Sequence, residues 1–137
     1  MNGKGRYDKP YTFNGGHVMF PDQNMLNRLY VRGSLKNVEG GCEFSINNTI
    51  DYTSLYGLGP VTVDGQAVDP ASIRIVMSNR ERRGNEITSS APLSVYVNVP
   101  LRVILEGLSL APGQHQVTFT ASSMDIGRVQ ISFQDTV

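Results

Sequence analysis

Residues 108–121, LSLAPGQHQVTFTA, combine a turn signal with a strand that alternates between two faces. Pro112 and Gly113 suit the central positions of a type II turn, because proline fixes φ and glycine supplies the positive φ of the second position. After this turn His115, Val117, Phe119 and Ala121 share one face, and Gln114, Gln116, Thr118 and Thr120 share the other. This pattern predicts a half-buried strand of an antiparallel sheet.

Similar alternation and turn signals run through most of the chain. Strands are predicted at residues 28–37, 42–50, 61–63, 66–68, 73–77, 93–105 and 129–133. The first two form a hairpin around residues 39–41, and Asp64-Gly65 closes the next one. Pro100, which lacks an N–H, marks an edge, a bend or a place where the chain passes from one sheet to the other. About eight to ten short strands predict an all-β, antiparallel β-sandwich.

The remaining segments are predicted to lie outside the sheets. Residues 1–27 are rich in Gly, Asn, Asp and Pro and form an extended arm, while residues 28–137 form the sandwich domain. The arm either folds over the edge of its own sheet or reaches another chain. Residues 51–60 are predicted as a connection, and residues 78–92 as a hydrophilic loop.

Composition excludes several classes of partner and site. The 137 residues carry 12 basic and 12 acidic side chains, so no overall field favours nucleic acid or an anionic membrane. Cys42 is the only cysteine, which excludes an intrachain disulfide and suits a reducing compartment. No window approaches the ~20 apolar residues that span a bilayer. We therefore expect a soluble, cytoplasmic protein.

The sequence offers little catalytic chemistry. Motifs of zinc proteases, serine hydrolases, P-loops and dinucleotide-binding folds are absent, and the two histidines have no metal-ligand spacing. Cys42 and His115 fall on apolar faces, where a buried thiol and a structural histidine are expected. No catalytic, cofactor-binding or metal-binding residue is predicted in this chain.

Some residues remain candidates for contact with a partner or ligand. Aromatic and histidine side chains in the arm and in the 51–60 connection suit interfaces, and the arginines of the 78–92 loop either clamp an anion or are simply solvated. The candidates are His17, Phe20, Tyr52, Tyr56, Arg80, Arg82 and Arg83.

The order of five segments resembles a known family. RGSLKN, GCEFSINNTI, GLGPVTVDGQAVDPASIRI, PLSVYVNVPLRVILEGLSLAPGQHQVTF and IGRVQIS follow one another within residues 28–134. This order is similar to that of the small β subunits of bacterial C-glycoside deglycosidases. The resemblance implies a β-sandwich bound to a larger, divalent-metal-dependent TIM-barrel subunit that cleaves the carbon bond of 3-oxo-C-glycosides.

The expected function follows from this resemblance. It is that of a non-catalytic accessory subunit of a heteromeric carbohydrate-active lyase, without turnover of its own and without a cofactor in this chain. Two alternatives are a free-standing carbohydrate-binding module, in which tyrosines stack on sugar rings, and a self-assembling structural protein that exchanges its arm. No nucleic acid or membrane partner is expected.

Overall fold

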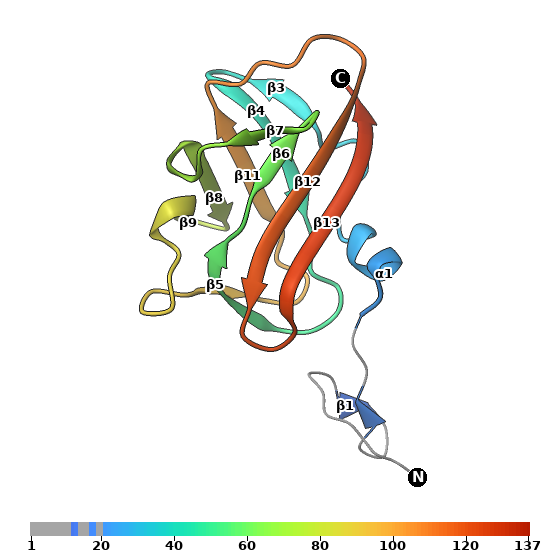
Figure 1. Ribbon diagram of the computed structural model, residues 1–137, viewed down its shortest axis with the longest axis vertical. Coiled ribbons are helices and arrows are strands. Elements are labelled where there is room, and N and C mark those ends of the chain that lie inside the picture. Colours follow the sequence, from blue (N-terminus) through green and yellow to red (C-terminus); the bar gives the residue numbers. More distant parts are fainter. Residues whose placement is uncertain (1–11, 14–16, 19–20) are drawn as a thin grey trace.

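The computed structural model describes residues 12–13, 17–18 and 21–137, and two antiparallel sheets packed face to face dominate it (Figure 1). The predicted all-β sandwich is confirmed. The two short strands before the sandwich, β1 (Thr12–Phe13) and β2 (His17–Val18), pair with each other. Of the candidate residues, Phe20 lies outside the described residues.

The first layer is a six-stranded sheet with the order β10-β5-β12-β6-β7, in which β13 pairs with the other side of β12. Its strands are β5 (Thr53–Leu58), β6 (Val61–Val63), β7 (Gln66–Val68), β10 (Leu93–Val95), β12 (Gln114–Ser123) and β13 (Gly127–Thr136). β10 and β13 therefore lie on opposite sides of the β5–β12 pair.

The second layer is a five-stranded sheet with the order β3-β4-β11-β8-β9. Its strands are β3 (Lys36–Val38), β4 (Gly41–Ile46), β8 (Ile73–Met77), β9 (Arg80–Arg83) and β11 (Leu101–Glu106). One α-helix, α1 (Gln23–Asn27), and the 3₁₀ turns η1 (Pro70–Ser72) and η2 (Gly84–Glu86) complete the described elements.

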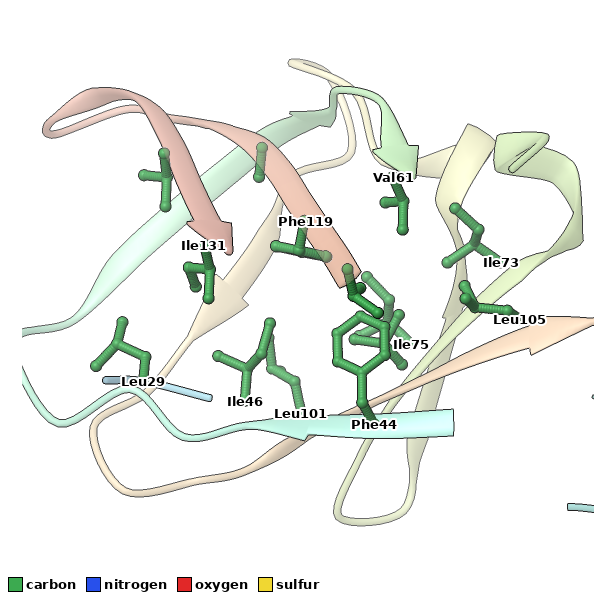
Figure 2. Packing of buried hydrophobic residues seen from close by; sticks show 14 of the residues in the cluster. Leu29, Phe44, Ile46, Val61, Ile73, Ile75, Leu101, Leu105, Phe119 and Ile131 are labelled. Atoms are coloured by element: carbon green, nitrogen blue, oxygen red, sulfur yellow. The ribbon is translucent and has the colours of Figure 1, made fainter. Parts of the chain in front are cut away.

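The core fills the space between the two sheets with side chains from every second position of the strands, which point inward (Figure 2). Phe44 of β4 meets Phe119 of β12 and Phe133 of β13 edge to face, with ring centroids 6.4 and 5.2 Å apart. Phe44 itself is fully buried. Aromatic contacts thus join strands of both layers near the centre of the sandwich.

Several turns follow the sequence prediction. Asp64 and Gly65 have φ values of 52° and 84°, as a two-residue hairpin turn requires, and they connect β6 to β7. Gly113 has the predicted positive φ, 125°. The predicted strand 93–105 divides at residues 96–100 into β10 and β11, which belong to different sheets, so the chain crosses between layers before Leu101.

The predicted strand at residues 28–37 is mostly wrong. Only its end, from Lys36, lies in a strand, because Ser34 N–H bonds to Val31 O at 3.0 Å and Gly33 adopts a φ of 85°, which closes a turn. Tyr30 forms an isolated bridge to Ile46. The predicted hairpin exists in shorter form, between β3 and β4.

Two segments predicted as loops contain strands. Residues 51–60 include β5, where Leu55 is buried and its neighbours face outward. Residues 78–92 include β9, a sheet-edge strand whose charged side chains suit an exposed edge. Each of these strands buries few apolar side chains and carries outward-facing tyrosines or arginines. Their sequences therefore lack the apolar alternation that predicts a strand.

α1 lies within the segment predicted as an arm and packs against β13. Asp22 caps its N-terminus by accepting a hydrogen bond from Met25 N at 2.8 Å, and Leu26 is buried. Gln23 Nε2 donates to Gln130 O at 2.7 Å, and Ser132 N donates to Asn27 Oδ1 at 2.9 Å. The helix therefore satisfies two backbone groups at the free edge of β13.

Candidate interaction surface

Tyr52 and Tyr96 form an exposed aromatic pair on the outer face of the six-stranded sheet. The register that places Thr53 opposite Val95 brings these residues together at the ends of β5 and β10. Their ring centroids lie 5.3 Å apart, with the planes inclined by 51°. Their exposed fractions are 46% and 48%, so the pair presents much of its surface to solvent.

Among the described residues, most of the exposed large hydrophobic side chains belong to chain segments that meet next to this pair. Tyr56 has the same strand parity as Tyr52 and is 39% exposed. Val97 follows Tyr96 in the chain, and Met124, 62% exposed, donates its N–H to Ser54 O at 2.9 Å. We call Tyr52, Tyr56, Tyr96, Val97 and Met124 the tyrosine patch. Clustered exposed apolar side chains are typical of interaction surfaces.

The aromatic pair is held by its surroundings. Tyr52 Oη lies 3.1 Å from Ser94 Oγ, within hydrogen-bond distance across the β5–β10 pair. Tyr52 N–H donates to Asp51 Oδ1 at 2.8 Å, which fixes the backbone just before β5. These contacts restrict the tyrosine before any partner binds, so that less conformational entropy is lost on binding.

The guanidinium groups of Arg82 and Arg83 have different partners within the chain. Arg82 donates to three main-chain oxygens, of Glu86, Ala91 and Pro92, at 2.9, 2.7 and 3.1 Å, and so holds the 84–92 loop. Arg83 instead donates to Glu106 Oε1 at 2.6 Å and to Ala71 O at 3.1 Å.

The hydrogen bond between Arg83 and Glu106 raises the pKa of Arg83 and lowers the pKa of Glu106. Arg74 adds a further cation, with its Nε 3.6 Å from Glu106 Oε2. Across the same sheet, Arg102 Nη2 lies 3.1 Å from Glu43 Oε1. The outer face of the five-stranded sheet thus carries ion pairs that link neighbouring strands, while Arg80 is exposed at the end of β9.

His115 is fixed by two acceptors. Its Nδ1 lies 2.7 Å from Asp64 Oδ2 and its Nε2 lies 2.7 Å from Ala111 O, and only 12% of the side chain is exposed. The Ala111 carbonyl, followed by the Asp64 carboxylate, raises the pKa of His115. The pKa of Asp64 is lowered by its bonds from Gln116 N–H and His115. We name this arrangement the His115 clasp, because it ties the β6–β7 turn to the start of β12.

Two further residues considered from the sequence, His17 and Cys42, both lie in strands. His17 lies in β2, which pairs with β1, and Cys42 is fully buried in β4, where desolvation raises the pKa of its thiol to about 11. The interior holds a cavity of about 50 Å³ with an apolar lining that includes Leu55, Phe119 and Ala121. This volume is far below the roughly 300–1,000 Å³ of typical ligand pockets.

Tyr96 and the Asp64–His115 contact were not singled out from the sequence. Tyr96 had a usable signal, since its parity within residues 93–105 is opposite to that of the apolar positions. Asp64 and His115 are 51 positions apart, and only the strand pairing brings them together.

The described residues contain neither a metal-binding cluster nor a helix that could span a membrane. Within residues 12–13, 17–18 and 21–137, no group of three or more His, Cys, Asp or Glu side chains is placed to hold a metal ion. None of the helices in this part of the chain is long and apolar enough to cross a membrane.

Comparison with known proteins gives one family. The model of the family described as hydroxymethylglutaryl-CoA reductase, N-terminal domain, matches residues 25–137. No curated protein sequence matches the chain. The family match covers every strand of both sheets, from β3 to β13.

This match overturns the resemblance to C-glycoside deglycosidase β subunits, and with it the expected roles in a carbohydrate-active lyase. The pieces on which that resemblance rested include the turns at Asp64-Gly65 and Pro112-Gly113. Such turns are required by backbone geometry wherever strands must be joined in this way, so they carry little information on function. With residues 25–137 matched, the chain belongs to the hydroxymethylglutaryl-CoA reductase N-terminal domain family.

Proposed function

We propose that this chain is a non-catalytic interaction subunit that docks through the tyrosine patch onto the larger catalytic chain of a hydroxymethylglutaryl-CoA reductase-type enzyme. The observation that carries the proposal is the exposed Tyr52–Tyr96 pair, with ring centroids 5.3 Å apart. The occupant of the patch is taken from the family, whose name describes this unit as one domain of a reductase.

The patch has the properties of an interface centre. Tyrosine is enriched at the centre of protein interfaces because it buries a large ring and keeps a polar end that hydrogen-bonds. Tyr52 and Tyr96 are each nearly half exposed and already support each other. Their burial against a second apolar surface would contribute on the order of 1–3 kcal/mol for each ring.

The described polar clusters support a structural role. Arg82, Arg83 and His115 use their donors on main-chain oxygens and on carboxylates of adjacent strands. These contacts stabilise loops and strand pairs. In this proposal the hydride chemistry of a reductase therefore takes place on the catalytic part, and this chain alone has no turnover.

Complex formation tests the proposal. The chain and the catalytic chain of a hydroxymethylglutaryl-CoA reductase from the same organism are co-expressed, and the mass of the assembly is measured by size exclusion with light scattering. We expect a mixed complex, weakened at least about tenfold by the double substitution Tyr52→Ser and Tyr96→Ser. Val31→Ser is the matched control, since Val31 is 39% exposed but lies outside the patch.

Two results would contradict the proposal. The first is a complex whose affinity is the same for the double variant and for Val31→Ser. The second is oxidation of a reduced nicotinamide cofactor by the purified chain alone in the presence of hydroxymethylglutaryl-CoA. Circular dichroism of each variant confirms that the sheets are intact.

Several expectations from the sequence belong to this proposal. The larger catalytic partner, the hetero-oligomer, the cytoplasmic location and the lack of nucleic acid or membrane partners are kept as parts of it. A free thiol in the core, Cys42, supports the reducing location. The divalent metal and the TIM-barrel form of the partner were implied by the deglycosidase resemblance alone, and no residue of this chain bears on them.

A further inference from the structure

A polar groove of about 500 Å³ lies at the free edge of β13, on the opposite side of the β5–β12 pair from the β10 end of the tyrosine patch. Residues from α1, from the segment after it and from β13 line the groove, among them Asn24, Arg28, Arg32, Ser132 and Gln134. The groove therefore combines side chains of the helical segment with the backbone of an edge strand.

The described residues cover the edge of β13 only in part. Backbone groups of successive strand residues point to opposite sides, and Ser132 N–H, bonded to Asn27, shows that the even-numbered residues of β13 face away from β12. By this alternation the carbonyl of Ser132 and both backbone groups of Gln134 face the groove. α1 covers the edge at Gln130 O and Ser132 N–H, and the groove begins beyond these two bonds.

The charge of the groove is positive. Arg28 and Arg32 are exposed, and none of the described residues lining the groove is acidic. The carboxylate of the adjacent Asp135 is engaged, since its Oδ2 accepts hydrogen bonds from Tyr30 Oη at 2.6 Å and Gly33 N at 2.8 Å. Two guanidinium groups beside strand groups that have no hydrogen-bond partner among the described residues complement an extended backbone that carries carboxylates.

We propose that this groove binds an extended acidic peptide segment of another protein, which adds to β13 as a short strand at Ser132–Gln134. The main-chain bonds of the added strand hold the segment in register, and its carboxylates pair with Arg28 and Arg32. This site is independent of the tyrosine patch, so either can fail without the other.

The probe is a fluorescein-labelled peptide, Glu-Val-Glu-Val-Glu, with a blocked C-terminus, titrated with the full chain at low salt. We expect saturable binding by fluorescence anisotropy and a chemical-shift change at the Gln134 amide. The double substitution Arg28→Gln and Arg32→Gln should weaken binding at least about tenfold. Double removal of charge at Arg80 and Arg128, which do not line the groove, is the matched control and should have a much smaller effect.

A second comparison separates strand addition from simple anion binding. Gln134→Pro removes one N–H from a strand edge, where proline is tolerated, and should abolish the binding. A peptide with the same charge and N-methylated valines cannot pair with the edge and should bind at least about tenfold more weakly. Because N-methylation changes the peptide and leaves the protein unchanged, this experiment does not depend on the folding of a variant.

Three outcomes would overturn the proposal. They are the absence of saturable binding, equal binding of the N-methylated peptide, and displacement of the probe by free glutarate at the concentration at which the unlabelled peptide displaces it. Equal binding or equal displacement would assign the groove to small anions instead of a strand. Loss of the tyrosine-patch complex would leave these results unaffected.

Discussion

Tyr30 stacks on Phe133, with ring planes inclined by only 3° and centroids 3.5 Å apart. The phenol Oη also donates to Asp135 Oδ2 at 2.6 Å and accepts from Leu35 N at 3.0 Å. Burial and the bond to Asp135 raise the pKa of Tyr30, while the pKa of Asp135 is lowered mainly by the same bond. One side chain thus ties the segment after α1 to the last strand.

Removal of the Tyr30 hydroxyl should destabilise the fold. Tyr30→Phe keeps the stacked ring but leaves the Leu35 N–H without its acceptor and removes a donor from Asp135, so we expect a loss of about 1–3 kcal/mol in the free energy of unfolding. Urea titration measures this loss. Tyr56→Phe, at an exposed position, is the control and should change stability by less than about 0.5 kcal/mol. Equal effects of the two substitutions would contradict this role of Tyr30.

The His115 clasp predicts a dependence of stability on pH. The pKa of His115 is higher in the folded state than in the unfolded state, so the protonated imidazole stabilises the fold. The contribution is fully present below the unfolded pKa of about 6.5, and it is lost as the pH rises through the higher folded pKa. Asp64 acts in the opposite sense, since its lowered pKa gives a contribution that is lost as the pH falls through that value.

The measurement is the difference in urea midpoint between the native protein and His115→Gln at pH 5.5 and at pH 8.5. The difference should be larger at pH 5.5, because the imidazolium donates to both Ala111 O and Asp64. Taking the difference cancels the titration of groups remote from the clasp. A difference that does not change between the two pH values would show that protonation of His115 adds nothing to stability.

The strands could be predicted wherever burial alternates along the sequence. Val117 and Phe119 in β12, and Val129 and Ile131 in β13, point inward with the predicted period of two. This works because each strand has one face on the core and one on solvent. Pro100 indicated an edge, a bend or a crossing between sheets, and the structure has the crossing, from β10 to β11.

The alternation of apolar residues did not predict the structure where a few residues turn the chain or where contacts with other strands hold a segment in place. Gly33 and Ser34 turn the chain within residues 28–37, although the apolar parity continues across the turn. β5 has a single buried side chain, Leu55, and its identity as a strand depends on pairing with β10 and β12. α1, with five residues, is held by the Asp22 cap and by contacts with β13.

The candidate surface was predictable in part. Tyr52 and Tyr56 were selected from their residue type, but their pairing with Tyr96 and Ser94 depends on the register between β5 and β10. Partner contact by Arg80, Arg82 and Arg83 stays a prediction, although the structure gives two of these guanidinium groups partners within the chain. Register across distant strands cannot be read from alternation alone.

The thiol of Cys42 should be unreactive in the native protein. It is fully buried, and desolvation raises its pKa to about 11. At neutral pH the sulfur is therefore neither accessible to a reagent nor ionised. We expect no reaction with a disulfide reagent such as dithiobis-nitrobenzoate at pH 7.5 and stoichiometric reaction in guanidinium chloride. Prompt labelling of the native chain would show that β4 opens on the time scale of the assay.

The last prediction concerns two glycines in neighbouring layers. A Cβ built at Gly41 of β4 would collide with the main-chain oxygen of Leu105 in β11, whereas one built at Gly57 of β5 meets nothing within 4 Å. Gly41→Ala must therefore push apart two strands that pair along the whole of β4, since Leu105 O is backbone and cannot rotate away. We expect a loss of about 1–3 kcal/mol or more in the free energy of unfolding. Gly57→Ala should be neutral or stabilising by up to about 1 kcal/mol, because alanine restricts the unfolded chain. Urea titration of both variants tests the contrast, and equal effects of the two substitutions would show that the contact with Leu105 does not determine the effect at Gly41.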